Sequence, residues 1–230
     1  MTNYKGIHSM SRSKTKPYRL FFVMTLLLTS VFLNIAGCSS SPIDKQSCKA
    51  WAEITTGEYL LTNNVWGAQD YKDIKQCIAT KDKGYEWNWQ WQGHDGNVLA
   101  YPSILYGHKP WNKHSTSPRL PVKVDDVKKL TVTFKAKQVG SGSHNLLLES
   151  WITSSAVPKP STRTVELAIH LFQQNWPGMP GKKVDTVFID NHQFDVYVEP
   201  SIDVPGDEYH WLYLGFVYTG VKNNQLPSNS

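Results

Sequence analysis

The stretch TVELAIHLF, residues 164–172, alternates between two kinds of side chain. Large aliphatic residues recur at every second position from Val165 to Leu171, and Glu166, Ala168 and His170 occupy the positions between them. Because successive side chains of a strand point to opposite faces, this period of two predicts a β-strand with one apolar face. Glu166 then lies on the opposite face, as the acid of an otherwise hydrophobic strand.

The same alternation recurs in other parts of the chain. Leu130, Val132 and Phe134 alternate with threonines and a lysine, which predicts a strand over residues 130–137 with one buried face. Further strands are predicted over residues 58–62, 86–92, 97–104, 146–153, 186–190, 194–199 and 209–218. Gly- and Pro-rich breaks separate these runs, and no window is a convincing amphipathic helix. This pattern predicts an all-β chain, folded as a β-sandwich jelly roll with a concave glycan-binding groove.

The N-terminus carries the pattern of an export signal. Residues 1–19 contain five basic residues and no acid, and residues 20–37 are almost wholly apolar. The segment ends Ile35-Ala36-Gly37-Cys38, which resembles the lipobox of bacterial lipoproteins, so Cys38 is the predicted lipid-bearing N-terminus. The alternative is a retained transmembrane anchor, since about 18 to 20 apolar residues can span a bilayer. We expect a signal peptide over 1–37, a tether over 38–47 and one domain over 48–230.

Removal of the signal changes the charge of the chain. The full sequence has 24 Lys and Arg against 19 Asp and Glu, but without residues 1–37 there are 19 of each. The net charge of +5 therefore belongs to the signal and gives no support for a nucleic-acid partner. With Cys38 assigned to lipid, Cys48 and Cys77 remain and are expected to form a disulfide in an oxidising compartment. We expect no metal site, because neither cysteine has a second Cys or His at ligand spacing. No cofactor is expected either.

Aromatic residues are unusually frequent in the exported part, which holds all nine tryptophans. Trp87, Trp89 and Trp91 recur with period two and so project from one face of a predicted strand. One interpretation is that this stripe fills the core. The other is a sugar-binding groove, where flat rings stack on pyranose faces; Trp91, Trp151 and His170 are the predicted substrate contacts.

Two glutamates are candidates for catalysis. Cleavage of a glycosidic bond commonly needs two carboxyl groups, one to protonate the leaving oxygen and one to act as nucleophile or base. Glu166 and Glu149 both lie in apolar strands, where a carboxylate is costly to bury unless it is paired. The alternative interpretation is that either side chain points to solvent.

Several motifs resemble those of glycoside hydrolase family 12 in their order and spacing over about residues 48–220. They are GEY at 57–59 leading to NNVWG at 63–67, QC at 76–77, WNWQW at 87–91 before AYPS at 100–103, HNLLLE at 144–149, and ELAIHL at 166–171. The resemblance implies a β-jelly roll and a retaining endo-β-1,4-glucanase of the cellulase or xyloglucanase type. It also implies that Cys77 pairs with the cysteine near the mature N-terminus.

Roles carried over by position make Glu166 the nucleophile, Glu149 the acid that orients it, and Asn64 and Trp66 substrate contacts. The sequence departs from the family at Glu149, where the usual residue is Asp, and at Ala168 and His170, where Met and Trp are usual. The family's acid/base glutamate has no match: Trp211–Val217 resembles an earlier strand, and an alternative alignment puts Val217 at the glutamate. The resemblance therefore implies that the C-terminal part of the family's fold is missing.

The resulting hypothesis is a lipid-anchored, monomeric hydrolase of β-glucan oligo- or polysaccharides in the cell envelope, at the outer membrane or cell surface. The missing acid/base motivates an alternative: a catalytically impaired glycan-binding lipoprotein, or a truncated remnant of the enzyme.

Overall fold

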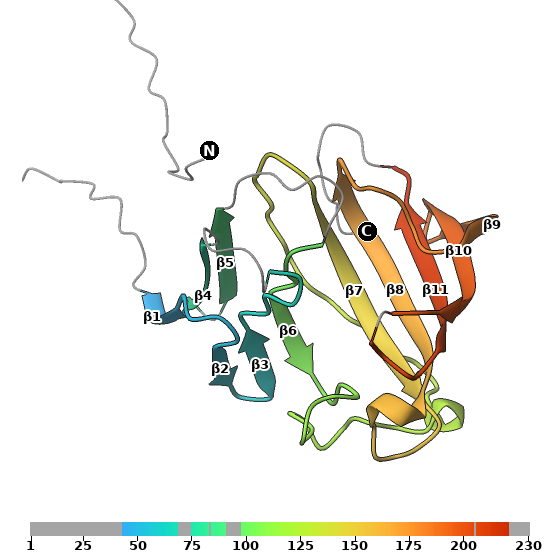
Figure 1. Cartoon of the computed structure of the whole chain (residues 1–230), viewed down its shortest axis with the longest axis horizontal. Helices are drawn as coiled ribbons and strands as arrows, with labels where there is room; N and C mark the ends of the chain where they lie inside the picture. The colour runs from blue at the N-terminus through green and yellow to red at the C-terminus, as the bar shows by residue number, and fades with distance from the viewer. Residues whose placement is uncertain (1–42, 69–74, 83, 91–97, 205, 221–230) are drawn as a thin grey trace, which may run out of the picture.

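The computed structural model describes residues 43–68, 75–82, 84–90, 98–204 and 206–220, and its strands form three sheets (Figure 1). The predicted signal segment, Cys38 and Trp91 lie outside the described residues. Two single turns of 3₁₀ helix, Val124–Asp126 and Pro160–Thr162, are the helical elements of the described part. No helix there is long and apolar enough to cross a membrane.

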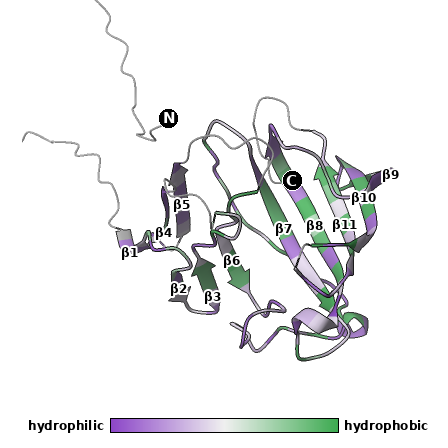
Figure 2. Ribbon diagram, viewed as in Figure 1, coloured by the Kyte–Doolittle hydropathy of each residue, from purple (hydrophilic) through white to green (hydrophobic). Residues whose placement is uncertain are grey.

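The largest sheet has five strands in the order β7-β8-β11-β10-β9. These strands are β7 His144–Thr153, β8 Arg163–Gln174, β11 Trp211–Tyr218, β10 His192–Ile202 and β9 Lys182–Ile189. The central pair, β8 and β11, is parallel, and the other neighbours are antiparallel. In Figure 2, most of β7, β8 and β11 has the colour of hydrophobic residues, and hydrophilic residues form bands between them. This pattern places polar side chains among apolar strands of the sheet.

Two three-stranded sheets lie on the β7 side of the large sheet (Figure 1). One has the order β1-β4-β5, with bounds Ile43–Ser47, Lys75–Lys81 and Gly84–Gln90; the other has the order β2-β3-β6, with bounds Glu53–Thr56, Tyr59–Thr62 and Ser103–Tyr106. A buried cluster of Ile54, Leu61 and Ile78 forms a core between the two, and Tyr85 and Trp87 pack against it. For Trp87, the core interpretation of the tryptophan stripe is thus confirmed.

The predicted all-β jelly-roll class is confirmed, and most of the predicted strands are present. The strand predicted over 130–137 was wrong: Leu130, Val132 and Phe134 lie in irregular backbone with exposed side chains. Alternation shows only which face a strand would bury, whereas a strand also needs a hydrogen-bonded neighbour, and no described strand pairs with this segment. The prediction over 97–104 was too long, since in the described part the strand begins at Ser103.

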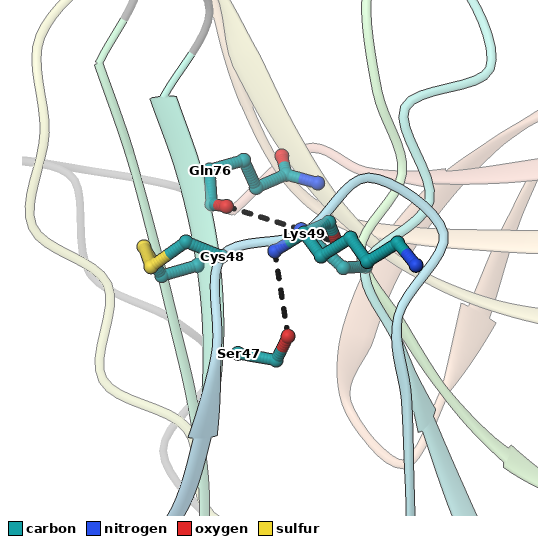
Figure 3. The surroundings of a disulfide bond; sticks show 6 residues. Ser47, Cys48, Lys49 and Gln76 are labelled. Atoms are coloured by element: carbon teal, nitrogen blue, oxygen red, sulfur yellow. Dashed lines mark hydrogen bonds between the residues drawn. A yellow bond between two sulfur atoms is a disulfide. The ribbon is translucent and has the colours of Figure 1, made fainter.

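Part of the segment expected to be a tether belongs to a sheet. Ile43–Ser47 forms β1 and pairs antiparallel with β4, so the tether prediction was wrong for these residues. The expected Cys48–Cys77 disulfide is present and joins the end of β1 to β4 (Figure 3). Beside it, the buried Asn63 amide donates hydrogen bonds to the carbonyl oxygens of Lys49 and Gln76 at 2.9 and 3.0 Å. Together these bonds fix the N-terminal segment to the small sheets.

Candidate active site

The register of β7 and β8 brings Glu149 and Glu166 to the same face of the large sheet. Glu149 is opposite Ala168, and Trp151 is opposite Glu166, so the two glutamates are diagonal neighbours on adjacent strands. Diagonal neighbours of this kind are roughly 7 to 8 Å apart. Both side chains line the same volume above the sheet.

That volume is a cavity of about 440 Å³. Its floor includes Glu149, Glu166, Ala168 and His170, and one wall is the loop of residues 176–180. The cavity face of β8 is the more buried face of this strand, since Ala168 is 1% exposed and His170 is 4% exposed. The alternation of the sequence identified the two faces but not which of them would be covered.

Glu166 is partly buried at the centre of this floor. Its Oε2 accepts a hydrogen bond of 2.8 Å from Trp211 Nε1. The pKa of Glu166 is raised to about 7, mainly by burial and to a smaller extent by the charge of Glu149, while the Trp211 hydrogen bond and the Arg163 charge oppose this rise. Glu166 therefore changes its charge near neutral pH, as a carboxyl group poised for chemistry would.

Glu149 lies beside Glu166 but is exposed to solvent. Its Oε1 accepts a hydrogen bond from Trp151 Nε1. Trp151 also packs edge-on against Trp211, with ring centroids 5.5 Å apart, and against Trp111, at 5.3 Å. Two mutually packed indoles thus donate their N–H groups to the two site glutamates.

His170 occupies the cavity floor two residues beyond Ala168. Its Nε2 lies 2.8 Å from the Tyr213 hydroxyl, and its buried Nδ1 has no hydrogen-bond partner among the described residues. Burial lowers the pKa of His170 to about 4, so the imidazole is neutral near pH 7. His170 is thus a neutral, buried polar residue of the cavity floor.

The structure separates other predicted contacts from the cavity. Asn64 Oδ1 accepts a hydrogen bond of 2.9 Å from the Trp66 backbone N–H, so this amide stabilises its own loop. Trp66 is 51% exposed, and neither residue lines the cavity. Asn64 is nevertheless tied to the cavity wall, because its carbonyl oxygen accepts the backbone N–H of Tyr101 at 3.2 Å.

Sequence reasoning missed several residues of the site. Tyr101 and Trp176 line the cavity with ring centroids 6.5 Å apart, and Trp111 stands half-exposed beside Trp151. Tyr101 lies in the AYPS motif, and Trp176 directly precedes the Pro- and Gly-rich turn at 177–181, so these motifs were the available signals. Among the described residues, no three His, Cys, Asp or Glu side chains form a group that could hold a metal ion.

The comparisons with known proteins agree with this geometry. The family model described as "Glycosyl hydrolase family 12" matches residues 57–224. Endoglucanase S of Pectobacterium parmentieri is 30% identical over 226 residues, covering 94% of this chain and 81% of that protein. A probable xyloglucan-specific endo-beta-1,4-glucanase A of Aspergillus fumigatus is 23% identical, covering 85% and 91%. The structure of a family 12 xyloglucanase from Bacillus licheniformis matches with a TM-score of 0.65 and 25% identity, covering 76% of each chain.

An all-β fold with two neighbouring glutamates in an aromatic-walled cavity defines the class of protein: a glycoside hydrolase. Within this class, the chain belongs to glycoside hydrolase family 12.

Proposed function

We propose that this protein is a retaining endo-β-1,4-glucanase of the cellulase or xyloglucanase type, acting on β-glucan polysaccharides. The observation that carries the proposal is Glu166, which is partly buried in the cavity and held by Trp211. The printed names of similar proteins, an endoglucanase and a xyloglucan-specific endo-β-1,4-glucanase, support the substrate class.

In the proposed reaction, the ionised Glu166 attacks the anomeric carbon as the bond to the leaving sugar oxygen breaks, and this oxygen takes up a proton from water. The product is a glycosyl-enzyme ester, which water then hydrolyses with overall retention of configuration. The Trp211 N–H holds one carboxylate oxygen of Glu166, which leaves the other oxygen available for the attack. Burial, with a smaller effect of the Glu149 charge, raises the pKa of Glu166 and thereby supports its basicity as a nucleophile.

Glu149 is assigned to orient Glu166 and not to donate the proton. The Glu149→Gln substitution is therefore expected to lower kcat about 10- to 100-fold on both β-glucan and an aryl cellobioside with a good leaving group. A proton donor behaves differently, because a good leaving group needs little protonation. Steady-state kinetics on both substrates checks this assignment; loss of glucan hydrolysis with normal aryl cellobioside turnover would contradict it.

The cavity wall of Trp176 and Tyr101 is proposed to stack on the faces of glucose units. The Trp176→Ala substitution is expected to raise KM for a soluble β-glucan about 10-fold, because it removes an aromatic face worth roughly 1 kcal/mol or more. The matched control is Trp51→Ala, since Trp51 is 51% exposed and does not line the cavity. Equal KM values for the two variants would argue against a sugar platform at Trp176.

His170 and Trp151 remain proposed substrate contacts. The His170 side chain on the cavity floor would contact a sugar unit there, and Trp151 would contact a sugar through the part of its ring that does not pack against Trp111 and Trp211. The partner is a β-glucan chain bound by a monomer.

We also propose that the enzyme is a lipoprotein of the cell envelope. The lipobox ending at Cys38 and the five basic residues before it support this localisation. In a bacterial host, Cys38→Ser is expected to prevent incorporation of labelled palmitate. The variant should either keep its uncleaved signal segment or move from the membrane to the soluble fraction. Unchanged labelling and fractionation would exclude Cys38 as the anchor.

A further inference from the structure

An ion pair lies behind the two tryptophans that hold the site glutamates. Arg163 begins β8, and Asp207 precedes the parallel neighbour β11. The Arg163 Nη2 donates to both carboxylate oxygens of Asp207, at 2.8 and 2.6 Å, and its Nε donates to the Pro160 carbonyl oxygen at 2.9 Å. The side chain of Arg163 is only 5% exposed. This pair, whose arginine is buried, thus joins the beginning of β8 to the loop that leads into β11.

The guanidinium group of Arg163 also contacts both indoles. Its central carbon lies 4.2 Å from the ring centroid of Trp211 and 5.9 Å from that of Trp151. A cation over an aromatic face attracts the ring and restricts its orientation. The same two indoles donate hydrogen bonds to Glu166 and Glu149. A continuous set of contacts therefore runs from the ion pair through the indoles to the site carboxylates.

We propose that the Arg163–Asp207 pair is a positioning device, which orients the Trp211 and Trp151 donors and so keeps Glu166 in its reactive geometry. The inference rests on the proposed function for its catalytic consequence, but the contacts themselves do not depend on it. Asp207 is needed because it fixes the guanidinium plane; the hydrogen bond from Arg163 holds the pKa of Asp207 below its ordinary value. Lys could keep the charge at position 163 but not the flat surface against the rings.

The substitution Asp207→Asn distinguishes a positioning role from a purely electrostatic one, because the two predict opposite changes in the pKa of Glu166. Removal of a negative charge near the site, with Arg163 retained, would lower the pKa of Glu166 or leave it unchanged. Loss of indole orientation would raise this pKa, because the Trp211 hydrogen bond stabilises the ionised form. Within the described part of the chain, the titratable and charged groups around Glu166 are Glu149 on β7, Arg163 and His170 on β8, Tyr213 on β11, and Tyr101 of the cavity lining.

The experiment is a titration of Glu166 by NMR of the protein labelled with ¹³C at the glutamate carboxyl carbons, with kinetics on soluble β-glucan. Glu166→Gln assigns the resonance. For Asp207→Asn we expect an upward shift of the Glu166 titration midpoint and a kcat lower by about 10-fold, with KM nearly unchanged. Asp207→Glu, which restores a carboxylate, is expected to recover most of the kcat. Arg163→Lys is expected to behave like Asp207→Asn.

The control is Asp195→Asn, which removes the 2.7 Å ion pair with Lys183 at the β9 and β10 edge of the same sheet. It should leave the midpoint and kcat unchanged. The proposal is overturned if Asp207→Asn and Arg163→Lys lower only the melting temperature while the midpoint and kcat stay at wild-type values. A wild-type protein inactive on every β-glucan would refute the proposed function, but the titration would still test the positioning.

Discussion

The Glu166→Gln variant is expected to lose hydrolysis of soluble β-glucan by at least ~10⁴-fold while it keeps its fold and its affinity for the substrate. Glutamine has the same shape but no nucleophilic carboxylate, so no glycosyl-enzyme can form. The Trp211 N–H that now donates to Glu166 at 2.8 Å can still donate to the glutamine carbonyl oxygen. Initial rates on soluble β-glucan and calorimetric binding of a cello-oligosaccharide measure the two effects separately.

A covalent probe gives an independent readout of the same prediction. A 2-deoxy-2-fluoro cellobioside with a good leaving group should label the wild-type protein at the peptide that contains Glu166, as detected by mass spectrometry. The Glu149→Gln variant should still be labelled at that peptide, although more slowly. Labelling of Glu166→Gln, or unchanged turnover of glucan by this variant, would refute Glu166 as the nucleophile.

The Glu166→Gln substitution is also expected to stabilise the folded protein at alkaline pH. The pKa of Glu166 rises on folding from 4.5 to about 7, because the charged form loses hydration in the cavity. A raised pKa means that the folded state binds the proton more tightly than the unfolded state. The contribution of Glu166 to the stability of the folded state is therefore fully present below about pH 4.5 and is lost as the pH rises through about 7. Above that pH, Glu166→Gln should unfold with a free energy about 3 kcal/mol higher than wild type.

Denaturant unfolding of both proteins from pH 4 to pH 9 checks this expectation. His170 acts in the opposite sense: its pKa is lowered by burial, so its contribution is present above about pH 6.5 and is lost as the pH falls through about 4. This term is common to both proteins and cancels in their difference. The difference should be small at pH 4, grow up to about pH 7 and then stay constant. A difference independent of pH would show that Glu166 titrates normally.

The sequence predicted local features of the fold and site better than features that depend on residues far apart in the chain. The alternation over residues 164–172 correctly placed Glu166 on a strand face, because side-chain direction follows from backbone geometry alone. The same reasoning failed for residues 130–137, where strand formation depends on a neighbour to supply hydrogen bonds. The pair of Glu149 and Glu166 was predictable from the motifs, whereas the Arg163–Asp207 pair joins residues 44 apart without any motif.

The sequence by itself determined the all-β class, the two candidate carboxylates, the family and the pairing of Cys48 with Cys77. These features follow from local periodicity, residue chemistry and motif order. Only the tertiary structure decided which face of β8 forms the cavity, which tryptophans hold the carboxylates and which fill the core. The physical reason is that burial, and with it the raised pKa of Glu166, depends on strand register and on loops that close over the sheet.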